Sequence, residues 1–174
     1  LFNYLCMHPQ IVGSVPKELF YFCSHPERGE RWYRRHFPRR AGLDAKGAIC
    51  GEATPTSLYS EQAARLAQKP IPKAKIIVLL REPASRAVSH YYHQVRFKNE
   101  TRPIDEVFSE ANINRWNEGD CPDLPWRNYF KWSDYATGLE YWLDNFPKEQ
   151  VLVLGAEELF RNPGEVFLAC VFQH

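Results

Sequence analysis

Arg81 and Ser89 are spaced so that both can bind one phosphate group. Arg81 follows the apolar run at residues 76–80, and Ser89 stands eight residues later in a segment of helical periodicity. An arginine donates two parallel charged hydrogen bonds to a phosphate, and a serine hydroxyl can add another. The free amides and the dipole at the start of a helix favour an anion at the same place. These residues therefore predict an anion-binding site where a strand leads into a helix.

The chain around Arg81 changes from the pattern of a buried strand to that of a helix. Residues 76–80 are all Ile, Val or Leu, which is typical of a parallel strand covered on both faces. Pro83 suits a first helical position. The apolar residues that follow at three- and four-residue steps, and that we expect on one helix face, are Ala84, Val88, Tyr91, Tyr92 and Val95. Because ligands bind at the carboxyl ends of strands in open α/β sheets, Arg81 is predicted to lie at such an edge.

Strands and helices alternate along the rest of the chain. We expect further strands at residues 10–14, 48–52 and 151–154. Helices are expected at residues 1–7, 27–37, 60–68, 84–97 and 135–146, and a last one opens at Asn162. This alternation predicts the α/β class, with a parallel sheet flanked by helices. The length of 174 residues suits a single domain.

The composition is that of a globular domain without a strong charge bias. Charged residues make up 25% of the chain and the formal net charge is +1, which argues against a nucleic-acid-binding protein. No apolar run reaches the roughly 18 residues of a membrane span, and no signal peptide is visible. The five cysteines stand singly, so neither a zinc site nor a C-x-x-C redox motif is predicted. An odd number of cysteines favours a reducing compartment.

Three motifs resemble those of sulfotransferases that use 3′-phosphoadenosine 5′-phosphosulfate (PAPS). The motif R-x-P-x-x-R-x-x-S-x-Y looks like the family's 3′-phosphate-binding segment, and its residues are Arg81, Pro83, Arg86, Ser89 and Tyr91. Residues 17–22, KELFYF, resemble the stretch that holds the catalytic base in the heparan sulfate branch. Residues 51–55, GEATP, match a further family segment, and residues 133–154 and 158–167 fit its later helices and strand. The resemblance covers nearly the whole chain.

The resemblance implies a P-loop-type nucleotide-binding fold and the transfer of a sulfuryl group from PAPS to a hydroxyl or amine. It implies that Arg81 and Ser89 bind the 3′-phosphate of PAPS, which acts as a co-substrate without a metal. Glu18 is the implied catalytic base, because the acceptor must lose a proton as it attacks sulfur. Arg86 is expected to pack or to pair with a carboxylate such as that of Glu82.

The implied acceptor is carbohydrate-like, but it could be a glycan or another alcohol or amine. Some members of the heparan sulfate branch carry a lysine where this chain has Ala53, so one lysine contact is lost here. The arginines among residues 28–40 could contact an anionic glycan or could form a solvated helix face, and the sequence leaves both open.

The Gly- and Lys-bearing loop that binds the 5′-phosphosulfate in this family is not found in the sequence. In the family it lies between the first strand and the first helix, which places it before Leu1. The last residues, 165–174, read as an amphipathic helix without a stop signal. We therefore expect residues 1–174 to be a single sulfotransferase domain truncated at both ends, and we expect this piece alone to transfer no sulfate.

Two other functions remain open at the level of the sequence. One is a non-catalytic or degenerate relative that keeps a nucleotide-binding architecture without transfer. The other is a kinase, which needs a similar phosphate cradle but also a Walker lysine and a Mg²⁺-binding acid, and neither is evident. The expected location is the cytoplasm, or the Golgi lumen if the chain comes from a membrane-anchored eukaryotic enzyme. The sequence gives no indication of an oligomeric state.

Overall fold

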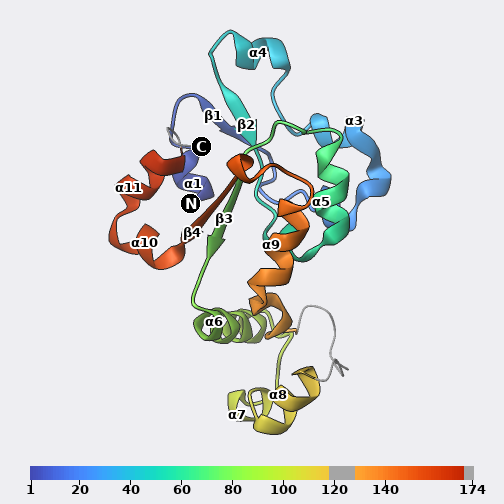
Figure 1. Ribbon diagram of the computed structural model, residues 1–174, viewed down its shortest axis with the longest axis vertical. Coiled ribbons are helices and arrows are strands. Elements are labelled where there is room, and N and C mark those ends of the chain that lie inside the picture. The colour runs from blue at the N-terminus through green and yellow to red at the C-terminus, as the bar shows by residue number, and fades with distance from the viewer. Residues whose placement is uncertain (118–127, 171–174) are drawn as a thin grey trace. The chain divides into compact units, whose positions relative to one another are not determined.

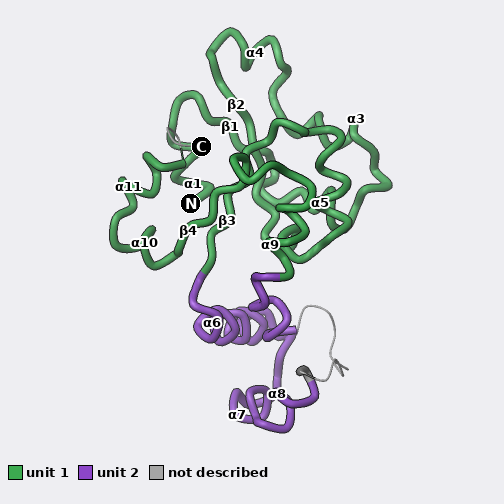
Figure 2. The backbone as a smooth tube through the Cα atoms, viewed as in Figure 1, with its two compact units in different colours: residues 1–80, 137–174 green, residues 81–136 purple. Residues whose placement is uncertain are grey.

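The computed structural model describes residues 1–117 and 128–170, and the chain divides into two compact units. Unit 1 comprises residues 1–80 and 137–174, and unit 2 comprises residues 81–136 (Figure 2). The chain leaves unit 1 directly after strand β3 (Ile76–Leu80) and returns to it within helix α9 (Tyr135–Leu143). Each unit is described below by itself.

Unit 1 contains four short strands and most of the helices (Figure 1). Its strands are β1 (Ile11–Gly13), β2 (Ile49–Gly51), β3 (Ile76–Leu80) and β4 (Val151–Gly155). Its helices are α1 (Phe2–Leu5), α2 (Tyr21–Ser24), α3 (Gly29–Arg34), α4 (Arg40–Asp44), α5 (Glu61–Gln68), α10 (Ala156–Arg161) and α11 (Pro163–Leu168). Unit 2 holds α6 (Pro83–Arg96), α7 (Ile104–Val107) and α8 (Glu110–Asn117), while α9 (Tyr135–Leu143) begins in unit 2 and continues in unit 1.

The strands form two parallel pairs. β1 pairs with β2 with Ile11 opposite Ile49, and β3 pairs with β4 with Ile76 opposite Val151. Parallel strands need crossover connections, and each pair here is joined through segments that contain helices. The predicted α/β class with parallel strands flanked by helices is therefore confirmed.

Strand β3 contacts one apolar cluster through Ile76 and another through Ile77. Ile76 packs against a core of α2, α3, α5 and α9 residues, whereas Ile77 packs against a cluster of α10 and α11 residues. Successive side chains of a strand point to opposite faces, so both faces of β3 are covered. Only Val78 is fully buried, however, and Leu79 remains 37% exposed. The predicted burial on both faces thus holds for the first part of the strand.

Small residues let α5 and α9 approach their neighbours closely. Ala63, Ala64 and Ala67 of α5 are completely buried in the main core. Ser60 caps α5 as its side chain accepts a hydrogen bond from the Ala63 amide at 3.1 Å. On α9, a Cβ at Gly138 would lie 3.0 Å from the Leu58 carbonyl oxygen, so only glycine fits there without movement.

Two local predictions need correction. The chain after β4 forms the separate helix α10 before α11, which the sequence pattern did not predict. Asn162 precedes α11 as expected, but its side chain makes no capping hydrogen bond.

In the described part of the chain, no helix has both the length and the apolar character that crossing a bilayer requires.

Candidate active site

The start of α6 is capped by the acidic residue that precedes it. The Ala84 amide donates to Glu82 Oε1 at 2.9 Å, and the Ser85 amide donates to Glu82 Oε2 at 2.7 Å. These backbone hydrogen bonds lower the pKa of the Glu82 carboxyl. The prediction that free amides at this helix start would bind an anion is therefore wrong, because a carboxylate of the chain already accepts from them.

Arg81 and Ser89 line one groove on the surface of unit 2. The groove has a volume of about 530 Å³, and Ser85 contributes a second hydroxyl to it. Its remaining lining residues are apolar or aromatic: Ala84, Val88 and Tyr92. We call it the α6 groove. The structure thus brings together the two residues whose spacing suggested a phosphate site, and it surrounds them with apolar surface.

The buried face of α6 differs from the predicted one. Ala87, Tyr91 and Gln94 are the buried residues of this helix. The predicted stripe is wrong in part, because Val88 is 38% exposed and Tyr92 is 57% exposed. The physical reason is that the polar Gln94 is on the buried face. Its side-chain and backbone oxygens accept hydrogen bonds there from Asn99 and Glu100, in the segment that follows α6. The helix is turned accordingly, and part of its apolar stripe lines the α6 groove.

Arg86 fastens α6 to the segment that precedes α9. Its Nε donates to Ser133 Oγ at 2.7 Å, and its Nη2 donates to the Tyr129 carbonyl oxygen. Ser133 Oγ also lies 3.1 Å from the Pro83 carbonyl oxygen, at the other side of the helix start. The expectation that Arg86 packs within the protein is consistent with these contacts.

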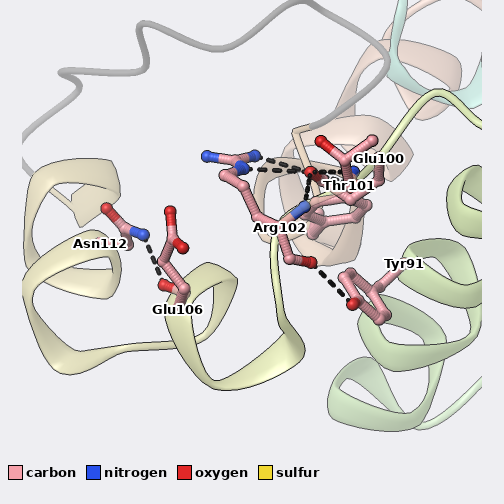
Figure 3. Close-up of polar contacts among 7 residues, drawn as sticks. Tyr91, Glu100, Thr101, Arg102, Glu106 and Asn112 are labelled. Carbon is pink, nitrogen blue, oxygen red and sulfur yellow. Dashed lines mark hydrogen bonds and ion pairs between the residues drawn. The ribbon is translucent and has the colours of Figure 1, made fainter.

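A buried carboxylate, that of Glu100, is connected to α6 through Arg102 and Tyr91 (Figure 3). The Glu100 side chain is fully buried and accepts hydrogen bonds from Arg102 Nη2 at 2.8 Å and from Tyr129 Oη at 3.1 Å. Tyr91 of α6 donates to the Arg102 carbonyl oxygen at 2.9 Å. Burial by itself would raise the pKa of Glu100, but the hydrogen bonds from Arg102 and Tyr129 lower it to about 2. We call these four residues the Glu100 cluster.

Glu18 lies in unit 1 on a short segment, residues 17–20, that follows β1. We call this stretch the Glu18 segment. The Glu18 side chain is 35% exposed, and its Oε1 lies 3.1 Å from Lys17 Nζ. The next residue, Leu19, is only 3% exposed and belongs to the main core. The segment therefore turns the Glu18 carboxylate toward solvent while it is anchored by Leu19.

A second carboxylate lies behind the Glu18 segment, at the end of β2. Thr54 Oγ1 donates to Glu52 Oε2 at 2.6 Å and accepts from the Phe20 amide at 3.2 Å. Burial raises the pKa of Glu52 most strongly, the charge of Glu18 raises it further, and hydrogen bonds from Thr54 and the Leu19 amide oppose the change. Sequence reasoning missed Glu52, although an acid and a threonine two residues apart after a strand share one side of an extended chain.

The arginines of residues 28–40 are partly neutralised. Arg34 pairs with Glu30 at 2.5 Å, and Arg40 pairs with Asp44 at 3.5 Å. The Arg28 and Arg35 guanidinium groups lie 4.7 and 5.9 Å from the ring centre of Trp32. This arrangement reduces the free positive charge that an anionic glycan would meet.

Over residues 1–117 and 128–170, no group of three or more His, Cys, Asp or Glu side chains is placed to hold a metal ion.

Comparison with a family model and with a solved structure gives consistent matches. The model described as the sulfotransferase domain matches residues 59–170. A crystal structure of a sulfotransferase from Alicyclobacillus acidocaldarius has a TM-score of 0.80 with this chain at 30% sequence identity. That match covers 99% of this chain and 73% of the other, so the two share one fold.

Curated relatives match over nearly all of this chain but over a minor part of their own length. Bifunctional heparan sulfate N-deacetylase/N-sulfotransferase 4 of Mus musculus is 28% identical over 95% of this chain and 19% of its own length. Heparan sulfate glucosamine 3-O-sulfotransferase 6 of Homo sapiens is 30% identical over 95% of this chain and 45% of its own length. The chain therefore spans less than half of either relative.

Proposed function

Because the chain belongs to the sulfotransferase domain family, we propose that the enzyme that contains it transfers a sulfuryl group from PAPS to a carbohydrate-like acceptor. The transfer forms a bond between sulfur and an acceptor oxygen or nitrogen. The bond between sulfur and the bridging oxygen of the 5′-phosphate breaks, and adenosine 3′,5′-diphosphate leaves. The names of the curated relatives, which act on heparan sulfate, support a sugar hydroxyl or amine as the acceptor.

The α6 groove is the observation that carries this proposal. Arg81 and Ser89 line it together, and they are the residues that bind the 3′-phosphate. The Arg81 guanidinium donates to two phosphate oxygens, and the Ser89 hydroxyl donates to a third. Since the α6 amides already bind Glu82, these side chains supply the donors that the helix start does not. The apolar lining at Val88 and Tyr92 suits a nucleotide better than a free phosphate ion.

Glu18 accepts the proton that the acceptor loses. A partly exposed carboxylate at the surface of unit 1 can reach the hydroxyl or amine of an incoming substrate, whereas Glu52 is occupied by Thr54. Lys17 Nζ lies 3.1 Å from Glu18 Oε1 and holds the carboxylate in place.

The proposal predicts a selective loss of cofactor binding in Arg81→Ala. We expect the Kd for adenosine 3′,5′-diphosphate to rise about ten- to hundredfold, since a charged hydrogen bond contributes about 1.5–3 kcal/mol. Binding of adenosine 5′-phosphosulfate, which lacks the 3′-phosphate, should change far less. Isothermal titration calorimetry with both ligands measures the difference.

Arg96→Ala is the matched control for this experiment. Arg96 is an exposed arginine on the same helix, and it does not line the α6 groove, so its loss removes the same charge without touching the groove. Equal losses for both ligands in Arg81→Ala, or an equal loss in Arg96→Ala, would contradict the phosphate site. Tight binding of both ligands without sulfate transfer by the full protein that contains this chain would favour a non-catalytic relative.

A further inference from the structure

The chain on both sides of Glu18 is held by hydrogen bonds to the residues behind it. The Lys17 carbonyl oxygen, which precedes Glu18, accepts from Ser14 Oγ at 2.9 Å and from the Ala53 amide at 3.4 Å. The Phe20 amide, two residues after Glu18, donates to Thr54 Oγ1 at 3.2 Å, and Thr54 Oγ1 donates to Glu52 Oε2 at 2.6 Å. A large rotation of the backbone at Glu18 would therefore strain or break a hydrogen bond on one side or the other.

Phe20 adopts a backbone conformation that is unfavourable for residues with a Cβ atom. Phe20 has φ 52° and ψ 20°, which is the left-handed region that glycine usually occupies. Its amide is fixed by Thr54 Oγ1 at 3.2 Å. The neighbours Leu19 and Tyr21 are buried in the core, so they oppose relaxation of the turn. Such conformations persist where the surroundings determine them from several directions, and they concentrate at functional sites.

Glu52 and Thr54 form one unit in this support. Thr54 is 8% exposed, and its hydroxyl hydrogen is donated to Glu52 at 2.6 Å, which leaves its oxygen free to accept from Phe20. The Thr54 hydroxyl thus links the Phe20 amide of the Glu18 segment to the Glu52 carboxylate.

We propose that Glu52 is a positioning residue that acts with Thr54 through the Phe20 amide to hold Glu18 in its reactive place. The inference rests on the proposed role of Glu18 as the base. Glu52 does not take the acceptor's proton, because its Oε2 is engaged with the Thr54 hydroxyl behind the Glu18 segment. The two carboxylates therefore divide the task, one facing the substrate and the other fixing the backbone behind it.

The test compares two substitutions at Thr54 in the active enzyme that contains this chain. Thr54→Val keeps the shape and removes the hydroxyl, whereas Thr54→Ser keeps the hydroxyl. We expect Thr54→Val to lower kcat about tenfold or more, with the Kd for adenosine 3′,5′-diphosphate unchanged. Thr54→Ser should stay within about threefold of the wild type. Exchange of the Phe20 amide, measured by NMR, should accelerate about tenfold or more in Thr54→Val alone.

Protection of the β4 amides serves as the control for folding, because β4 lies in the same unit. A variant that loses protection there has unfolded, and Glu52→Gln, which keeps the side-chain shape, then replaces it in the comparison. If Thr54→Val with intact β4 amides keeps wild-type kcat and slow exchange at Phe20, the positioning role is wrong. Equal losses in Thr54→Ser and Thr54→Val would also overturn it, since the hydroxyl would then not matter.

A double variant separates the positioning role from the role of the base. If Glu52 acts only through Glu18, then Glu18→Gln with Glu52→Gln should be no slower than Glu18→Gln alone, within about twofold. Independent losses that multiply would overturn the inference. Wild-type turnover in Glu18→Gln would refute the base and the positioning role together. Slow turnover in Glu18→Gln with full activity in Glu52→Gln and Thr54→Val would refute the positioning role alone.

Discussion

Glu18→Gln is expected to reduce turnover about a hundredfold or more in the active enzyme that contains this chain. Gln is nearly isosteric with Glu, but its amide cannot accept the acceptor's proton. Because Glu18 is not one of the residues that line the α6 groove, the Kd for adenosine 3′,5′-diphosphate should remain near that of the wild type. The measurements are sulfate transfer from PAPS at saturating acceptor and calorimetric titration of the nucleotide.

Glu140→Gln is the control, because Glu140 is an exposed glutamate in the middle of α9 within the same unit. It removes the same charge away from the Glu18 segment, so its turnover should match the wild type. Turnover of Glu18→Gln within a few-fold of the wild type would show that Glu18 is a surface carboxylate paired with Lys17. The base would then have to be sought elsewhere in the enzyme.

The fold could be predicted from the sequence wherever short-range patterns determined it. The apolar run of β3, the helix α5 and the proline at the start of α6 each appear where they were expected. The pairing of β3 with β4 could be predicted as parallel, but its register depends on contacts between residues far apart in the chain. The sequence does not contain that information in any local pattern.

The candidate site could be predicted only for residues that match a spaced motif. Arg81 and Ser89 share such a motif, and the structure places them in one groove. Glu52 stands in the GEATP segment, but its role was missed because it comes from burial and from the Thr54 hydroxyl. Glu100 lies in no motif, and its role comes from burial and from the Arg102 and Tyr129 donors. The orientation of α6 was mistaken for a related reason. Hydrogen bonds bury the polar Gln94, and an apolar pattern cannot reveal them.

Glu100→Gln is expected to destabilise unit 2 by about 3–5 kcal/mol at neutral pH, the range for removing one partner of a buried ion pair. The change leaves the Arg102 guanidinium without its carboxylate partner. It also places a neutral amide where the Glu100 carboxylate accepts hydrogen bonds. Tyr91 of α6 is tied to the same cluster through the Arg102 carbonyl (Figure 3), so α6 should lose protection first. Urea unfolding followed through NMR signals of the α6 amides measures this loss.

Glu106→Gln provides the control, because Glu106 is an exposed acid on α7 in the same unit. Its substitution should change the free energy of unfolding by less than about 0.5 kcal/mol, as surface changes usually do. A loss in Glu100→Gln that is as small as this would mean that the cluster contributes little to the stability of unit 2.

The pH dependence gives an independent check on the Glu100 cluster. The pKa of Glu100 in the folded chain is about 2, below its ordinary value of 4.5, so the folded state binds the proton more weakly than the unfolded state. Its contribution of about 3 kcal/mol is therefore complete above pH 4.5 and is lost as the pH falls from 4.5 toward 2. The stability difference between wild type and Glu100→Gln should narrow by about 2 kcal/mol between pH 7 and pH 3. A stability difference that stays constant over this range would show that Arg102 and Tyr129 do not hold the Glu100 carboxylate in its charged form. Another contact would then have to hold α6 in place.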